Sequence, residues 1–251
     1  MTQHLLQGRT EDEILWFRRR DFLARAAAWA AMGGFASAQA QQRSNIVELR
    51  GDALLNGARL NGQQSIQTGD SIETGPGSHL VFAIGNSAFQ VRQNSRMTVE
   101  RGTTLNTVSV LRLLTGAVAS VWGRGTSRQI VTPTLTAGIR GTGVYAEVLP
   151  DQAFRSYFCN CYGTVDLGAG ADRAVSRSDY HQSFWGEPEP KNGRSITPAG
   201  AINHTDEEIE FLAQLVNQRT AWQVAGRKGV KDGKGYMEER PMTDHPAMQL
   251  R

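Results

Sequence analysis

The sequence predicts a mainly β protein, a sandwich or roll of short strands with one C-terminal α-helix, on three observations. From Ile46 onward, short runs with an apolar residue at every second position alternate with turn signals rich in Gly, Asn and Asp. No helical pattern of ten residues occurs between Ile46 and Leu167, so a parallel α/β sheet is not expected. The 27 Gly and 8 Pro residues suit a chain with many tight turns.

Composition excludes several classes of protein. A 251-residue chain with 39% hydrophobic and 20% charged residues is neither a multi-span membrane protein nor a coiled coil nor a fully disordered chain. The net charge is +3 and no stretch of the chain concentrates it, so we expect no nucleic-acid partner. Two cysteines are too few for a disulfide-stapled scaffold.

Residues 1–40 have the pattern of an export signal. A charged start is followed by a weakly apolar run, Ala26 to Ala36, and by the small-residue triplet Ala38-Gln39-Ala40. The apolar run is too short to span a bilayer, which takes ~20 residues. We expect cleavage after Ala40 and no stable membrane span in the mature protein. The alternatives are an uncleaved anchor and an amphipathic N-terminal helix.

The string Arg19-Arg20-Asp21-Phe22-Leu23 within this leader resembles the twin-arginine signal, with Arg19, Arg20, Phe22 and Leu23 at its characteristic positions. Arg18 and Ala24 depart from the residues common at the flanking positions. The resemblance implies export of a folded protein to the bacterial periplasm.

The strands are expected in order along the chain. Leu80, Phe82 and Ile84 share one face of a strand, and Phe89 and Val91 share one face of the next. Gly85-Asn86 lies between these two strands and predicts a hairpin. Further alternating runs follow at Met97–Val99, Val108–Leu114, Ala117–Val121 and Val144–Val148.

Residues 46–167 resemble the FecR-type domain, the periplasmic part of bacterial iron-siderophore signalling regulators. The resemblance rests on the order of several short pieces, which are Gly51–Gly57, Thr68–Gly75, Leu80–Ile84, Leu113–Val118, Thr132-Pro133 and Ala137–Val144. Its most specific parts are the Gly69-Asp70 turn and the string Arg140-Gly141-Thr142-Gly143. It implies a FecR-like β domain and a non-catalytic binding or signalling role at the cell envelope, with an envelope protein or ligand as partner.

The resemblance is incomplete at the N-terminus. The regulators carry a cytoplasmic helical segment that holds a sigma factor, whereas eighteen residues precede Arg19 here. We therefore expect the fold of the family but not its control of transcription. The Gly141-Thr142-Gly143 string is expected to form a tight bulge or bend between Ile139 and Val144. A loop that cradles an anion is the alternative.

Cys159 and Cys161 are the candidate metal ligands. Residues two apart on a strand point to the same side, with Cα atoms ~6.5 Å apart, which is poor geometry for a disulfide. Paired thiolates suit a soft metal such as zinc or copper(I), and His181 and His204 would complete the site. The alternative is that the cysteines are small buried hydrophobes and the histidines are satisfied polar residues.

A C-terminal extension is expected over residues 168–226. Within it, Thr205 and Glu208 predict a capping box that begins a helix at about 205–222, with an apolar stripe to pack on the β domain or on a partner. We interpret Glu187-Pro188-Glu189-Pro190 as a loop and residues 227–251 as a disordered tail.

Two functions stay open from sequence alone. The first is a non-catalytic periplasmic binding or signalling module, and the second is a periplasmic metal-binding or redox protein that uses Cys159 and Cys161. No enzymatic activity is expected, because the chain has no Gly-x-Ser-x-Gly elbow, no His-Glu-x-x-His motif and no P-loop.

Overall fold

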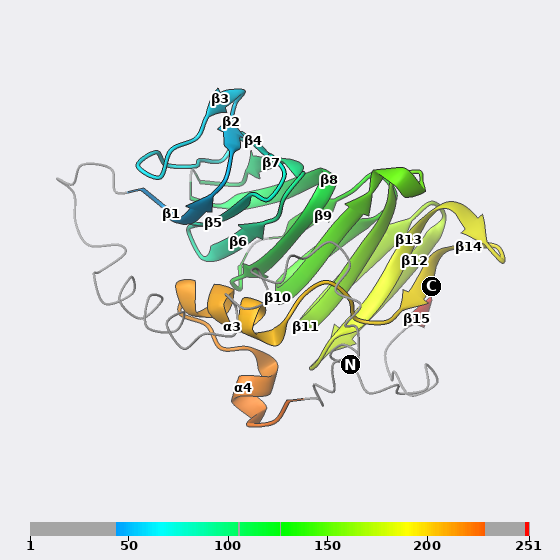
Figure 1. Cartoon of the computed structure of the whole chain (residues 1–251). Helices are drawn as coiled ribbons and strands as arrows, with labels where there is room; N and C mark the ends of the chain where they lie inside the picture. The colour runs from blue at the N-terminus through cyan, green and yellow to red at the C-terminus, as the bar shows by residue number, and fades with distance from the viewer. Residues whose placement is uncertain (1–43, 105, 126, 229–248, 251) are drawn as a thin grey trace, which may run out of the picture.

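The computed structural model describes residues 44–104, 106–125, 127–228 and 249–250. The predicted mainly β class is confirmed, because these residues form one mixed sheet of 15 strands with α-helices only near the C-terminal end of the chain (Figure 1). The expected leader, residues 1–40, and most of the expected tail lie outside the described residues. Within the described part of the chain, no helix is long and apolar enough to cross a membrane.

The strands in chain order are β1 Ile46–Arg50, β2 Ala53–Leu55, β3 Ala58–Arg59, β4 Ser71–Thr74, β5 His79–Ile84, β6 Ser87–Val91, β7 Arg96–Arg101, β8 Val108–Trp122, β9 Arg128–Val131, β10 Thr136–Leu149, β11 Arg155–Ala169, β12 Asp172–Ser178, β13 Gln182–Lys191, β14 Arg194–Ala199 and β15 Gln249–Leu250. The helices are the 3₁₀ turn η1 Pro150–Gln152, α3 Asp206–Leu215 and α4 Ala221–Ala225.

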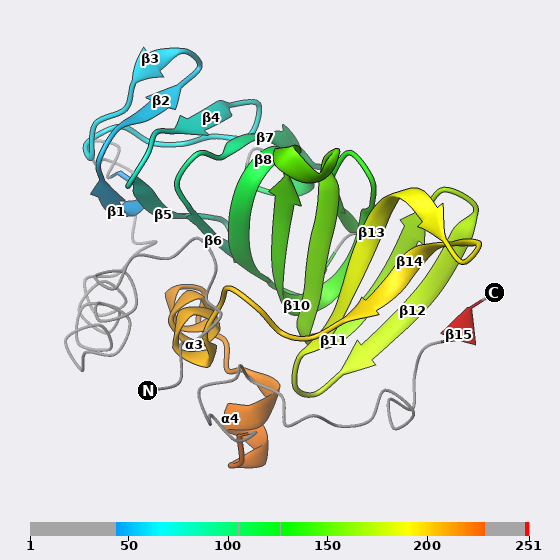
Figure 2. The same cartoon turned by 45° about the vertical axis from the view of Figure 1, so that its right-hand side comes forward.

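Three strands are longer than all the others in the described sheet. β8, β10 and β11 contain 15, 14 and 15 residues. Each continues through a glycine at which its pairing changes. In β8, the partner changes from β7 to β6 around Gly116, whose φ is 75°. A Cβ there would lie 2.5 Å from the Cα of Ser95, so only glycine allows this crossing. The sheet bends strongly as a result (Figure 2).

The expected bulge at Gly141-Thr142-Gly143 is confirmed. The register between β10 and β11 shifts between Arg140 and Gly143, and Gly141 has a φ of 69°. The expected hairpin at Gly85-Asn86 is also confirmed, because β5 pairs with β6 up to Ile84 opposite Ser87.

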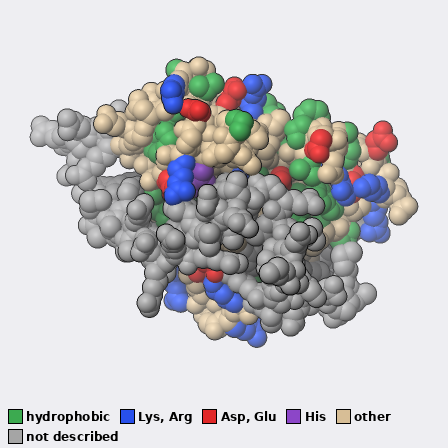
Figure 3. Space-filling view, viewed as in Figure 1, with side chains coloured by type: hydrophobic (Ala, Val, Ile, Leu, Met, Phe, Trp, Pro, Cys, Tyr) green, Lys and Arg blue, Asp and Glu red, His purple; other side chains and the backbone are tan. Residues whose placement is uncertain are grey.

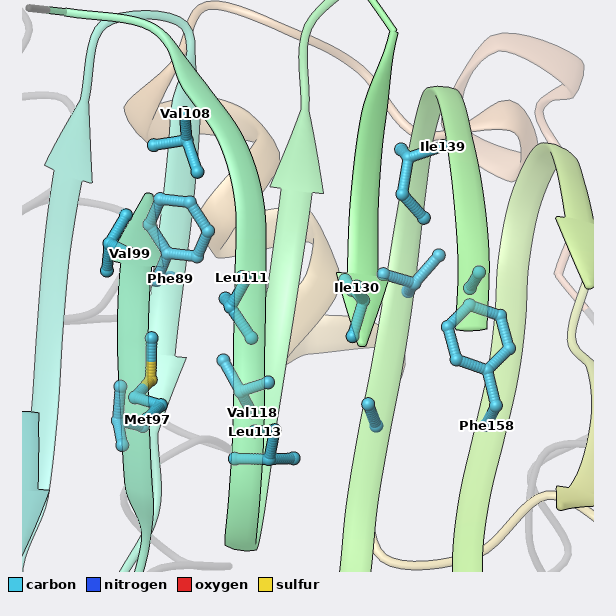
Figure 4. Close-up of a cluster of buried hydrophobic side chains, with 14 of the residues drawn as sticks. Phe89, Met97, Val99, Val108, Leu111, Leu113, Val118, Ile130, Ile139 and Phe158 are labelled. Atoms are coloured by element: carbon cyan, nitrogen blue, oxygen red, sulfur yellow. The ribbon is translucent and has the colours of Figure 1, made fainter. Parts of the chain in front are cut away.

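Apolar side chains fill both faces of the middle of the sheet. One face carries the larger core, which includes Phe89, Met97, Leu111 and Phe158 (Figure 4). Alternate residues of the same strands form a second core on the other face, and α3 packs over it (Figures 1 and 2). Strand β5 is therefore buried at all six positions, with Leu80, Phe82 and Ile84 in the first core as predicted.

The prediction of a loop at Glu187–Pro190 is wrong, because these residues belong to β13. Proline has no N–H to donate to a sheet ladder, and for that reason a Pro-rich run predicts a loop. Here the pairing of β13 with β14 is irregular between Gly186 and Lys191, which accommodates both prolines. β12 and β13 also extend the sheet at β11.

The single helix expected at about 205–222 is two helices. The predicted capping box of Thr205 and Glu208 begins α3. Asn217, with a φ of 55°, follows the end of α3, and a second capping box at Thr220 begins α4. Of the expected tail, Gln249–Leu250 pairs with β12, and residues 229–248 and 251 lie outside the described part.

The surroundings of Glu187 predict how the stability of the protein depends on pH. Its carboxylate is buried and accepts two hydrogen bonds of 2.7 Å from Arg155 and one of 2.7 Å from Thr197, with Lys191 at 3.0 Å. Burial opposes ionisation, but these donors outweigh it and lower the pKa of Glu187 from 4.5 to about 2. A lowered pKa adds stability that is complete above the unfolded pKa and is lost as the pH falls through the folded one.

We therefore expect Glu187→Gln to lower the free energy of unfolding by roughly 2–4 kcal/mol at about pH 7, and by roughly half as much at about pH 3, between the unfolded and folded pKa values. Urea denaturation at the two pH values measures this. Glu189→Gln, at an exposed position of the same strand, is the control and should change little. An equal loss at both pH values would contradict the assignment.

Candidate metal centre

Cys159 and Cys161 point to the same side of β11, as their spacing predicts. Both thiols are free and fully buried in the second core, and their Sγ atoms lie 3.9 Å apart. Phe158, the residue before Cys159, lies in the opposite core. The alternation of the strand therefore presents two sulfur atoms to the space beneath α3.

His181 reaches the thiols because β11 changes partner beside them. Residues 156–160 of β11 pair with β13, and residues 163–169 pair with β12. The turn from β12 to β13 therefore comes back to Cys161, whose carbonyl accepts the His181 N–H at 2.9 Å. His181 has a φ of 41°, an unusual value for a non-glycine residue, and its Nδ1 lies 3.5 Å from Cys159 Sγ.

His204 comes from the segment that leads into α3. It precedes the N-cap residue Thr205, and its Nε2 lies 3.1 Å from His181 Nδ1. The ring stacks on Tyr145 with centroids 4.7 Å apart. Its Nδ1 is 2.6 Å from the carbonyl oxygen of Ile202, so Nδ1 carries the proton that is donated there and Nε2 faces the sulfurs.

The structure thus brings together all four residues that the sequence singled out as metal ligands. One donor atom from each of Cys159, Cys161, His181 and His204 lies within 4.8 Å of every other, and all four side chains are buried. Tetrahedral zinc with Zn–S ~2.3 Å and Zn–N ~2.05 Å requires separations of ~3.8 Å between sulfurs, ~3.6 Å between sulfur and nitrogen, and ~3.3 Å between nitrogens. The corresponding distances of 3.9, 3.5 and 3.1 Å fit this geometry.

A second layer of polar groups orients the histidines. Asp206 Oδ1 lies 3.1 Å from His181 Nε2, and the Tyr180 hydroxyl donates to the same carboxylate at 3.2–3.3 Å. Lys228 Nζ lies 3.7 Å from Asp206 Oδ2. Metal-bound histidines in proteins almost always donate their other ring N–H in this way to a carboxylate or a carbonyl. Both histidines of this cluster have such a partner.

The pKa values of the cysteines and of His181 also favour the binding of a metal cation. Burial opposes the Cys159 thiolate, but a hydrogen bond from Cys161 and the neighbouring histidines hold the pKa of Cys159 well below its usual range. Burial and the adjacent Cys159 raise the pKa of Cys161. Burial lowers the pKa of His181, but hydrogen bonds to Asp206 and Cys159 outweigh it and raise the pKa to about 9. The group therefore holds a thiolate beside a histidine, and a metal ion would displace the remaining protons.

The other motif residues lie apart from this cluster. Arg140 pairs with Asp166 on an exposed part of the sheet, and Thr142 is buried in the bulge between Gly141 and Gly143. Asp70, next to Gly69, accepts the backbone N–H of Gln67 at 2.7 Å and closes its turn. Arg19, Arg20, Phe22 and Leu23 of the expected export signal lie outside the described residues.

Sequence reasoning missed the groups that support the centre. Asp206 fits in sequence as an acidic residue that favours the start of a helix, and no sequence pattern singles out Tyr145 or Trp222 as part of a site. Trp222 stacks on His181 with centroids 5.3 Å apart. The position of Asp206 two residues after His204 was the one available signal.

Charged side chains do not form a single-sign field on the face shown in Figure 3, where acidic and basic residues of the described part are interspersed. This agrees with the near-neutral net charge of the chain.

No protein-family model matches the chain, and no curated protein matches it. Two crystal structures of a candidate anti-sigma factor from Parabacteroides distasonis ATCC 8503 are similar to part of it, at 10% and 12% identity with TM-scores of 0.43 and 0.42. The matches cover 51% and 53% of this chain and 58% and 60% of those chains, so this chain spans less than two thirds of their length. Similarity at this level assigns neither family nor function.

A buried ion pair holds α3, and with it His204, against the sheet. Glu208 Oε1 accepts hydrogen bonds from Arg92 and, at 2.7 Å, from Gln90, both on the sheet side. Its Oε2 accepts the Thr205 N–H at 2.6 Å and completes the capping box. The Glu208 side chain is fully buried, so its removal would take away a buried carboxylate that compensates the Arg92 charge.

We expect Glu208→Ala to lower the free energy of unfolding by about 3–5 kcal/mol, because removing one partner of a buried pair strands the other. Chemical denaturation measures the change. Glu207→Ala is the matched control, since the neighbouring side chain is 40% exposed and should cost less than about 1 kcal/mol. Equal effects of the two substitutions would show that the ion pair does not anchor α3.

Proposed function

We propose that this chain is a metal-binding protein whose Cys159, Cys161, His181 and His204 hold one zinc ion. The observation that carries the proposal is the convergence of two sulfur and two nitrogen donors in a fully buried position, with separations of 3.9, 3.5 and 3.1 Å for the Cys159–Cys161, Cys159–His181 and His181–His204 pairs. A tetrahedral set of two sulfurs and two nitrogens is a characteristic environment for zinc.

The charge of the cluster supports zinc over copper(I). Two thiolates and one Zn²⁺ form a neutral centre, whereas Cu⁺ would leave one negative charge in a site that is shielded from water. Buried net charge is costly unless it is compensated. Lys228 pairs with the acidic residues of α3, including Asp206, and so offsets charge outside the ligand set.

The centre is proposed to be structural or regulatory. Catalytic zinc sites keep one position for water or substrate, whereas this cluster offers four buried protein ligands. The ion would join three separate parts of the chain, which are β11, the turn before β13 and the segment before α3. Its binding free energy would therefore add to the stability of the docked helix.

Zinc content tests this proposal. We expect about one zinc per chain by elemental analysis of protein purified without chelator, and its loss in the Cys159→Ser/Cys161→Ser variant or in His204→Asn. The matched control is His79→Asn, at a buried histidine in β5 outside the cluster, which should keep the metal. Zinc-free wild type, or full zinc in the double variant, would mean that the cysteines only fill the core.

We further propose that the protein works in the bacterial periplasm as a non-catalytic binding or signalling module, with an envelope protein or ligand as partner. The twin-arginine-like string supports export, and the FecR-like order of motifs supports the role. Export in a folded state would let a buried centre be filled before transport.

Fractionation of cells tests the route. Replacing both Arg19 and Arg20 with Lys should keep the protein in the cytoplasm, since the twin-arginine resemblance depends on that pair. Replacing Arg25 with Lys, outside the string, is the control and should leave delivery intact. Unchanged periplasmic delivery of the double variant would refute the twin-arginine assignment.

A further inference from the structure

Helix α4 is attached to the rest of the protein by very few side chains. Within residues 221–228, Trp222 is the one buried side chain, at 2% exposure, whereas Val224 is 70% exposed. By contrast, seven of the ten residues of α3 are buried, and the Glu208 ion pair anchors that helix. Regions with few buried contacts open locally at far lower free energy than the core. α4 can therefore leave its place while α3 stays docked.

The single anchor of α4 lies directly on the candidate metal centre. The Trp222 indole stacks on the His181 ring with an interplanar angle of 27°, and meets the edges of Tyr162 and Tyr180 with centroids 5.7 and 5.4 Å apart. Its Nε1 donates to Glu210 Oε1 at 2.7 Å. The remainder of α4 is exposed or half-buried, so the indole is the part of α4 that covers His181.

The chain after α4 is attached to the same place. Lys228 pairs with Glu210, and its Nζ lies 3.7 Å from Asp206 Oδ2 and 3.9 Å from Glu207 Oε1. Asp206 in turn holds His181. Lys228 is 37% exposed, so this attachment is screened by solvent and is weaker than the buried pair under α3.

A metal ion cannot reach the four ligands while all of them are fully buried. On the sheet side, access would require separation of hydrogen-bonded strands, and on the α3 side it would require separation of the Glu208 pair and the apolar face. The α4 side requires displacement of one indole, with its hydrogen bond to Glu210, and of the partly exposed Lys228 from its acidic partners on α3. Opening a path for the ion on the Trp222 side therefore breaks the fewest interactions.

We propose that α4 is a lid over this centre, with Trp222 as its plug, and that opening of the lid sets the rate at which metal enters and leaves. The inference rests on the proposed metal-binding function for the ligand and concerns its regulation. A lid that controls access changes the uptake and release rates together and has much less effect on their ratio, the Kd.

Stopped-flow kinetics with zinc and a chromogenic chelator test the lid. In Trp222→Ala, both release and uptake should accelerate by roughly tenfold or more, because the plug is lost. Trp222→Phe keeps an aromatic plug, so its release and uptake rates should stay close to those of wild type. Val224→Ala, on the exposed side of α4, should also have the rates of wild type. Leu111→Ala, in the opposite core, separates lid opening from general loss of stability, since it should lower stability without the same acceleration.

The reactivity of Cys159 and Cys161 in the metal-free protein gives a second readout that needs no metal. Reaction with 5,5′-dithiobis(2-nitrobenzoate) under native conditions should be faster in Trp222→Ala than in wild type and Leu111→Ala by a similar factor. Unchanged thiol reactivity in Trp222→Ala would overturn the lid, whether or not zinc binds. Faster reactivity in a protein that takes up no zinc would support the lid and refute the proposed metal-binding function.

Discussion

The second face of the sheet has to be covered, because β5, β6, β8, β10 and β11 present apolar or small side chains on both sides. Their alternation leaves no solvent-facing side in the middle of the sheet. α3 provides the cover, and apolar burial alone would permit several positions for a helix. The Glu208 ion pair with Arg92, together with the bond from Gln90, selects one of them. That choice places the residue just before the helix, His204, above the two thiols.

The same burial means that every polar atom of the cluster needs a bonding partner. Two thiols, two imidazoles and the Asp206 carboxylate occupy a region shielded from water, where unpaired polar groups and charges are costly. Each histidine has one nitrogen bonded outside the cluster and one turned toward the sulfurs. A divalent cation would satisfy the inward-facing atoms at once and neutralise two thiolates. Hydrogen bonds alone leave the cluster with a thiolate beside a protonated His181 in low dielectric surroundings.

Local patterns predicted the local features well. Alternation placed Cys159 and Cys161 on one face, the Gly85-Asn86 pair gave the hairpin, and Thr205 with Glu208 gave the helix start. The errors arose where tertiary pairing overrides local preference. The prolines of β13 lie in a strand because its pairing is irregular around them, and the long strands continue through glycines that usually signal turns.

The four candidate ligands could be named from the sequence, but the way in which they come together could not be predicted from it. His181 reaches Cys159 because β11 changes partner at that point of the sheet. His204 lies beside the thiols because the ion pair of Glu208 with Arg92 fixes the position of α3. Both depend on contacts far apart in the chain, which residue spacing does not encode. Asp206 and Trp222 were missed for the same reason, since each supports the histidine of another element.

Zinc-edge X-ray absorption of the protein, purified without added metal, tests the central claim most directly. Tetrahedral binding by the four residues predicts two sulfur scatterers at ~2.3 Å and two nitrogen scatterers at ~2.0–2.1 Å, with the outer-shell pattern of imidazole rings. A first shell of oxygen and nitrogen without sulfur would contradict the account, because it would place any bound zinc away from Cys159 and Cys161.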